Sequence, residues 1–373
     1  MPDWRSRPGK TRLGDEQYCS SRREPGWRRL VNLDMFLSPR ASAAFIAAEA
    51  KDVFIEDQAV VATAQDIAKD LIGDQNVFKL SDWAAQGCHP RQIDDNTANW
   101  IFVVDTVNFS FWQPDDQPQF AVTEDGQTWT GYWALCACLN RAIKKGYDML
   151  NPNFYAKLTL EQLSDIFVGD NGQVMPMLEE RLNNLAEAGK ALVEKFDGNF
   201  VNCIKRAGGS AQTLLKLIQA NFPSFRDTAI YNDMGVSFLK RAQILVADLW
   251  NCYGGKGLGS FFDIDTVTMF ADYRVPQVLA YFGVLRYSDT LMELLRQQHL
   301  FSSGDRMELE IRGCCIHAVE LLLTSIRREL NEQGYDSSLV NAIRLDNYLW
   351  TYRREHSQLV ARVPYHRIRT IYY

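Results

Sequence analysis

The chain has 373 residues, of which 46% are hydrophobic and 12% aromatic, enough to bury a large core in one big domain or two small ones. Its 40 basic residues stand against 46 acidic ones, and the net charge of −6 argues against a dedicated binder of duplex nucleic acid, whose phosphates need basic neutralisation. A small anionic ligand remains compatible with this charge.

The eight cysteines lack the regular spacing of a secreted disulfide framework, which indicates a reducing compartment. We find no apolar run near the roughly 18 residues that a membrane span needs, and no charged-then-apolar leader. The expected location is therefore the cytoplasm, with no membrane contact; a nuclear or mitochondrial location stays open.

Residues 1–36 differ from the rest of the chain, because they are rich in Arg, Gly, Pro and Ser and have few apolar anchors. This composition predicts a basic, disordered extension, so that residues 37–373 form the functional domain. A mitochondrial transit peptide is the alternative. Such peptides are poor in acids, whereas this segment contains four: Asp3, Asp15, Glu16 and Glu24.

From Ser38 onward most of the chain has helical hydrophobic periodicity. Helix starts are indicated at Thr159 and at Pro276, where a missing N–H is harmless. The clearest strand signal is residues 120–133, two β-rich runs around Asp125-Gly126 that predict a hairpin. We therefore expect a mainly α single domain with a small β-hairpin appendage. Its clearest helices are predicted over residues 39–54, 59–72, 131–147, 177–196, 210–222 and 237–250.

One acidic residue falls on an apolar helix face. Leu339, Ile343, Asp346 and Trp350 are separated by four, three and four positions, which places them on one stripe of a predicted helix. A carboxylate there is costly unless it is paired, hydrogen-bonded or open to a pocket. The spacing leaves a buried salt bridge, a helix cap and a functional site as alternatives.

A similar stripe carries Ile101, Asp105, Asn108 and Trp112, and its two polar residues either satisfy local backbone groups or belong to a site. Asp272 precedes the helix that begins at Pro276, in a segment that should be a short irregular connector. It could pair with Arg274, cap the coming helix, or serve a site.

Other charged or motif-like residues have ordinary explanations. Lys240 lies off the apolar stripe of its predicted helix and is expected to be solvated, while Glu308 and Arg312 have the spacing of a helix-surface pair. The glycine-rich residues 254–260 lack the order of a phosphate loop and are expected to form a flexible turn. As a helix–hairpin–helix turn the same residues are an equally weak match.

The sequence contains no recognisable motif for a metal site or for a catalytic nucleophile. The five histidines never combine with Cys or Asp at metal-ligand spacing, and there is no GxSxG elbow or convincing cysteine–histidine dyad. We expect no metal and no cofactor. Carboxylates remain the best catalytic candidates.

Longer motifs carry a family resemblance from about Pro39 to Tyr373. The chain resembles the queuosine salvage protein family, also called queuosine 5′-phosphate N-glycosylase/hydrolase. The resemblance implies release of queuine from queuosine 5′-monophosphate, for reuse in tRNA modification, by a fold similar to helix–hairpin–helix DNA glycosylases. The motifs are "DTVNFSFW", "GYWALCACLNRA", "FPSFRD", "SFLKRAQILVADLW", "TMFADYRVPQVL", "GDRMELEIRG", "LDNYLW" and "PYHRIRTIYY".

The resemblance also implies the site. Asp346 is assigned to the sugar as nucleophile or cation stabiliser and Asp272 to the base edge, with the reverse assignment left open. Phe270 and Trp350 are expected to stack on the base as aromatic walls. His89 and Lys240 are expected to contact the cyclopentenediol or the phosphate. Leu345, the neighbour of Asp346, is the remaining substrate-binding residue.

Two alternatives from other classes remain at this point. Fold analogy alone suggests a nucleic-acid glycosylase, which the acidic charge disfavours. A non-enzymatic helical scaffold or binding protein would have every buried acid structurally satisfied. The expected partners are the nucleotide substrate and the product queuine, without stable direct binding of nucleic acid.

Overall fold

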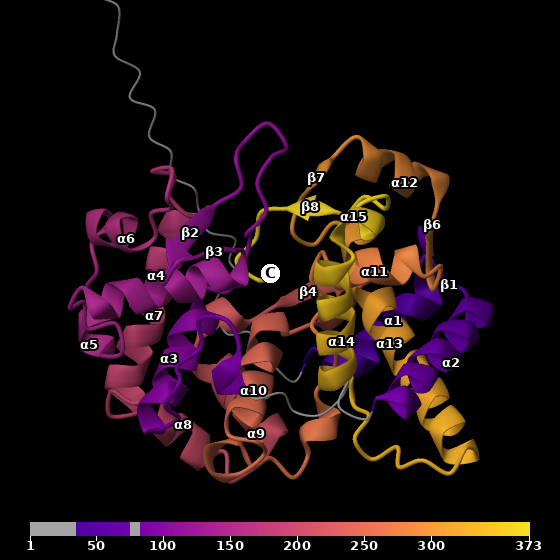
Figure 1. Ribbon diagram of the computed structural model, residues 1–373, viewed down its shortest axis with the longest axis horizontal. Coiled ribbons are helices and arrows are strands. Elements are labelled where there is room, and N and C mark those ends of the chain that lie inside the picture. Colours follow the sequence, from indigo (N-terminus) through magenta and orange to yellow (C-terminus); the bar gives the residue numbers. More distant parts are fainter. Residues whose placement is uncertain (1–34, 75–82) are drawn as a thin grey trace, which may run out of the picture. The chain divides into compact units, whose positions relative to one another are not determined.

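The structure is a computed structural model that describes residues 35–74 and 83–373. Nearly all of the predicted N-terminal extension lies outside the described residues. The described part is mainly helical, as predicted, with short two-stranded sheets (Figure 1). The helices are α1 (Pro39–Glu49), α2 (Asp57–Gly73), α3 (Asp95–Thr106), α4 (Tyr132–Lys144), α5 (Pro152–Tyr155), α6 (Leu160–Ile166), α7 (Leu178–Lys195), α8 (Phe200–Arg206), α9 (Ala211–Asn221), α10 (Lys240–Cys252), α11 (Val275–Tyr281), α12 (Asp289–Arg296), α13 (Arg306–Glu332), α14 (Ala342–Glu355) and α15 (Ser357–Val360).

The strands form four small sheets within the described ranges. The predicted hairpin is confirmed as β2 and β3, and its turn residues Asp125 and Gly126 both have positive φ, as the favoured two-residue turns require. The other three sheets were not predicted: β1 pairs with β6 and β4 with β5, both antiparallel, while β7 and β8 are parallel. The strand bounds are β1 (Val53–Ile55), β2 (Ala121–Glu124), β3 (Gln127–Thr130), β4 (Thr228–Tyr231), β5 (Met234–Ser237), β6 (Leu285–Tyr287), β7 (Leu300–Phe301) and β8 (Arg367–Ile368).

Several helix boundaries follow from local chemistry. The start predicted at Thr159 is confirmed, since Thr159 and Gln162 form a reciprocal capping box at α6. Pro276 opens α11 as expected. The first predicted helix is too long, because it ends at Glu49 and the β-branched residues that follow pair with β6.

The stripe predicted for α14 is wrong at its first position. The Asn341 side chain accepts a hydrogen bond from the N–H of Arg344 and caps the helix, so Leu339 lies before the helix and is 42% exposed. Ile343 and Asp346 do share the buried side of α14. The helix therefore carries its acid inward, as the periodicity indicated.

Buried apolar side chains form two main clusters. One gathers residues of α3, α4 and α7 to α10, and the other gathers residues of α1, α2, α11 and α13. Helix α14 contributes Ile343 to the first cluster and Leu345 and Leu349 to the second, and Figure 1 shows it between the two groups of helices. Asp346 thus lies where the two clusters meet.

Candidate active site

A cavity of about 1290 Å³ opens at this boundary, larger than the roughly 300–1,000 Å³ of most small-molecule sites. Its walls come from α10, α14, the connector before α11 and the turn that precedes α3. Of the seven residues predicted for the site, Leu345 is fully buried in the apolar core and does not line the cavity. The six that line it are His89, Lys240, Phe270, Asp272, Asp346 and Trp350.

Asp346 is 6% exposed and borders the cavity from α14. Its Oδ1 accepts a hydrogen bond of 3.0 Å from the N–H of Phe270, and it forms no ion pair with any described residue. Burial raises the pKa of Asp346 to about 8; the Phe270 N–H and the nearby Lys240 oppose this rise, while Asp272 adds to it. The carboxyl group is therefore largely protonated at neutral pH.

Asp272 caps the start of α11, one of the structural alternatives considered for it, and it also faces the cavity. Its Oδ1 accepts hydrogen bonds from the N–H groups of Arg274 and Val275, at 2.7 and 3.0 Å, and so holds the start of α11. The Arg274 guanidinium instead packs over the ring of Tyr365, 4.2 Å from its centroid. Within the described structure, Oδ2 of Asp272 makes no hydrogen bond and is available to a ligand.

The prediction of a solvated Lys240 is wrong, because the residue is 7% exposed and its side chain lines the cavity. Helix α10 begins at Lys240 and is buried on nearly all sides, so a position off its apolar stripe is covered as well. Burial lowers the pKa of the ammonium, while the carboxylates of Asp272 and Asp105 oppose that shift. No hydrogen bond of the ammonium is found among the described residues.

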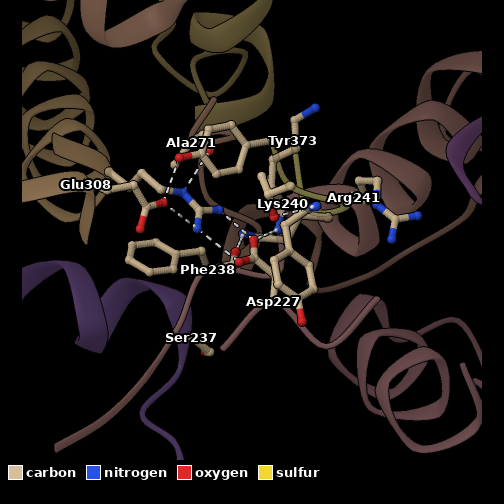
Figure 2. Close-up of polar contacts among 12 residues, drawn as sticks. Asp227, Ser237, Phe238, Lys240, Arg241, Ala271, Glu308 and Tyr373 are labelled. Carbon is tan, nitrogen blue, oxygen red and sulfur yellow. Dashed lines mark hydrogen bonds and ion pairs between the residues drawn. The ribbon is translucent and has the colours of Figure 1, made fainter. Parts of the chain in front are cut away.

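A buried ionic network fixes the start of α10 and the connector that carries Asp272 (Figure 2). Arg312 donates to both carboxylate oxygens of Asp227, at 2.9 and 2.5 Å, and to the carbonyl of Ala271 at 3.2 Å. Oδ2 of Asp227 also accepts the N–H of Lys240 at 3.0 Å. The network therefore sets the positions of two cavity walls relative to each other.

The pair predicted between Glu308 and Arg312 exists, with a shortest distance of 3.5 Å, but it is not on the surface. Both residues are buried, and Glu308 also accepts a hydrogen bond of 2.6 Å from the hydroxyl of Tyr373. An i,i+4 spacing cannot tell an exposed helix face from a covered one.

His89 forms the opposite wall as a neutral ring. Its Nδ1 donates to the carbonyl of Trp83 and its Nε2 accepts from the hydroxyl of Tyr132, both at 2.9 Å, and burial lowers its pKa to about 4. The ring stacks on Trp83 with centroids 3.7 Å apart. Gly87 permits this arrangement, since it has a φ of +42° and an added Cβ would lie 2.3 Å from the ring of Trp133.

Sequence reasoning missed most of the cavity lining, including Trp83, Tyr132 and Asp248. Trp83 and Tyr132 carry no local signal, because only the fold brings their segments to His89. Asp248 could have been noticed as an acid within the apolar run of α10. The stripe predicted from Ile101 to Trp112 is wrong beyond Asp105, because α3 ends at Thr106. Asn108 lies after the helix and lines the cavity, while Asp105 is fully buried behind it and accepts its side-chain N–H at 3.0 Å.

Sequence comparison places the chain in a family. The model of a family described as queuosine salvage protein matches residues 88–373. The chain belongs to this family. A Mus musculus relative named queuosine 5′-phosphate N-glycosylase/hydrolase is 44% identical over 339 residues, which cover 90% of this chain and 99% of the relative.

Relatives with the same name occur in distant organisms. The Schizosaccharomyces pombe protein is 36% identical and covers 89% of this chain and 98% of its own length. The Sphaerobacter thermophilus protein is 41% identical and covers 74% of this chain and 81% of its own length. The cavity therefore belongs to a chain that aligns with queuosine salvage proteins across nearly all of the described residues.

Two further properties concern the described part of the chain. None of its helices is long and apolar enough to span a membrane. It also holds no group of three His, Cys, Asp or Glu side chains arranged to bind a metal ion.

Proposed function

We propose that this protein hydrolyses the N-glycosidic bond of queuosine 5′-monophosphate and releases queuine for reuse in tRNA modification. The family and the names of its relatives support this activity. The observation that carries it is the pair of carboxylates, Asp272 and Asp346, that face one large cavity without an ion pair among the described residues. A scaffold would have its buried acids satisfied, so these unpaired groups favour a ligand site over a structural role.

The reaction explains why fixed carboxylates suit the cavity. As the ribosyl C–N bond breaks, positive charge develops on the sugar, water adds to the anomeric carbon, and the departing base takes up a proton. A carboxylate held in a water-poor site can stabilise that charge or act as nucleophile. Queuine is a 7-deazapurine and has no ring nitrogen at position 7 to protonate, so stabilisation of the sugar cation carries more of the catalysis.

The hydrogen bonds of the two acids favour Asp272 for the sugar and Asp346 for the base edge, the reverse of the assignment made from sequence. Oδ1 of Asp272 already accepts two backbone donors, which fixes its orientation but leaves only Oδ2 for a ligand. Asp346 accepts one donor and can still receive the adjacent N–H groups of the guanine-like edge.

Steady-state release of queuine by Asp272→Asn and Asp346→Asn tests this proposal. We expect Asp272→Asn to lose on the order of 10²-fold or more in kcat, and Asp346→Asn to lose mainly through a higher KM. The opposite split would restore the first assignment. If both variants stayed folded and released queuine at nearly the wild-type rate, the two-carboxylate mechanism would be wrong.

Binding of the product is a simpler test of the site. Queuine at 100-fold excess over its Kd should stabilise the wild-type protein by about 2.7 kcal/mol. A scaffold without the site would show no thermal shift. The fold similarity to helix–hairpin–helix DNA glycosylases and the cytoplasmic location remain part of the proposal, the first supported by the helical walls of the cavity and the second by the cysteine pattern of the sequence.

A further inference from the structure

Asp248 is a cavity acid to which the reaction above gives no role. It lies on α10, on the face that also presents Ile244 and Asn251 to the cavity. No hydrogen bond or ion pair of its carboxyl group is made with the described residues at normal geometry. The indole N–H of Trp83 lies near the carboxyl group without completing a hydrogen bond. It still lowers the pKa of Asp248 and so offsets part of the rise caused by burial.

The surroundings of Asp248 make a bound cation favourable. Burial raises the pKa of its carboxyl group well above the ordinary value, and the neighbouring Asp105 raises it further. Lys240 opposes the rise but forms no ion pair with Asp248 in the described structure. An acid desolvated in this way and left without a partner costs folding free energy, which a ligand cation could recover.

The proposed substrate carries such a cation. Queuine differs from 7-deazaguanine by an arm at position 7, in which an aminomethyl nitrogen links the base to a cyclopentenediol. That secondary amine is protonated at neutral pH. It has two N–H donors and can form charge-assisted hydrogen bonds with a carboxylate.

We propose that Asp248 binds the protonated secondary amine of the queuine arm and makes the site selective for queuosine over nucleotides without an arm. This inference rests on the proposed function. The rings of Trp83, His89 and Tyr132 line the same cavity and supply the apolar surface and the hydroxyl group that the cyclopentenediol would contact. Asp346 and Asp272 remain free for the base edge and the sugar.

Selectivity follows because a ligand without the arm leaves the Asp248 carboxyl group without a partner. A nucleotide without the arm would close the cavity over Asp248 and leave its carboxyl group desolvated and unpaired. Sites built to bond a polar group reject analogues that lack it by as much as roughly 10⁴-fold. A guanine nucleotide would then be a poor substrate even though its base edge is the same.

The test compares kcat/KM for queuosine 5′-monophosphate and for 7-deazaguanosine 5′-monophosphate in the wild type and in Asp248→Asn. We expect the wild type to prefer the armed substrate by about 10²-fold or more. Asp248→Asn should lose most of that preference, through slower turnover of the armed substrate and no loss of turnover of the armless one. The 7-aminomethyl analogue, which is cationic but has no diol, should show the same loss.

Asp115→Asn is the matched control, because Asp115 lines the cavity but is already paired with Arg367 at 2.7 Å. It should leave the preference between the two substrates unchanged. An equal loss on both substrates in Asp248→Asn, or an unchanged preference, would overturn the proposal.

A wild-type protein that releases neither base would instead overturn the proposed function. Calorimetric binding of queuine and 7-deazaguanine to the wild type and to Asp248→Asn would then decide the amine subsite separately. Tighter wild-type binding of queuine that is lost in the variant supports the subsite, and equal binding of the two bases overturns it. The variant should melt no lower than the wild type, since the substitution removes a desolvated acid.

Discussion

Two groups of buried charges lie side by side in this protein and differ in their partners. In the network of Asp227, Glu308 and Arg312, each acid has an arginine within 3.5 Å. Around the cavity, Asp346 and Asp248 form no ion pair with described residues, and Asp272 bonds only to backbone. Asp346 is buried like the charges of the network, so pairing is what separates a structural charge from one that is available to a ligand.

A large expected effect is on the free energy of unfolding, and it tests the contrast between the paired and the unpaired charges. Asp227→Asn removes the closer of the two carboxylates that pair with the buried Arg312 guanidinium, and breaking such a pair costs about 3–5 kcal/mol. Urea unfolding should show this as a lower free energy of unfolding.

An exposed pair supplies the control for that experiment. Glu56 bonds Arg286 at 2.5 Å, and both side chains are largely exposed. Exposed pairs contribute at most about 1 kcal/mol, so Glu56→Gln should change little. If the two variants lost the same free energy, the contrast between the paired and unpaired groups would have no energetic basis.

A smaller effect concerns the cavity wall. Trp350 packs against the first apolar cluster and borders the cavity, where it can stack on the base. Loss of one aromatic platform weakens base binding by about 1–3 kcal/mol, so Trp350→Ala should raise the Kd for queuine roughly 10- to 100-fold. Phe262→Ala, at an exposed position away from the cavity lining, should leave the Kd unchanged. An unaltered Kd in Trp350→Ala would remove the stacking role.

Sequence periodicity predicted the inward side of α14 and hence the burial of Asp346. It could not predict what covers a helix face, which is why Glu308 and Arg312 were placed on the surface although both are buried. It also misjudged Lys240, because α10 is buried on nearly all sides and a position off its apolar stripe is covered as well. Each error concerns tertiary contacts that hydrophobic spacing does not encode.

The far wall of the cavity illustrates a different limit. Trp83, His89, Tyr132 and Asp248 come from three segments separated by tens of residues, and no local pattern connects them. The family resemblance supplied His89 but not the residues around it. The fold was therefore predictable as a class, while this wall required the structure.

The last prediction concerns the pH dependence of stability, and it tests Asp346 without substrate. Its pKa is about 8 in the folded chain and about 3.9 when unfolded. Between these values the folded protein keeps a proton that the unfolded chain has released, so the contribution of this residue to stability falls as pH rises. Asn cannot titrate, and Asp346→Asn should therefore gain stability relative to the wild type from pH 4 to pH 8.

Thermal or urea unfolding of both proteins at pH 5, 6, 7 and 8 measures the difference, in which the titrating groups far from Asp346 cancel. Because the Asn side chain keeps the shape and can still accept the N–H of Phe270, packing should contribute little to the change with pH. A constant difference across this range would mean that Asp346 is ionised throughout and compensated in the folded state. It would then belong with Asp227 among the structural charges, and the distinction drawn between the two groups would fail at its most important residue.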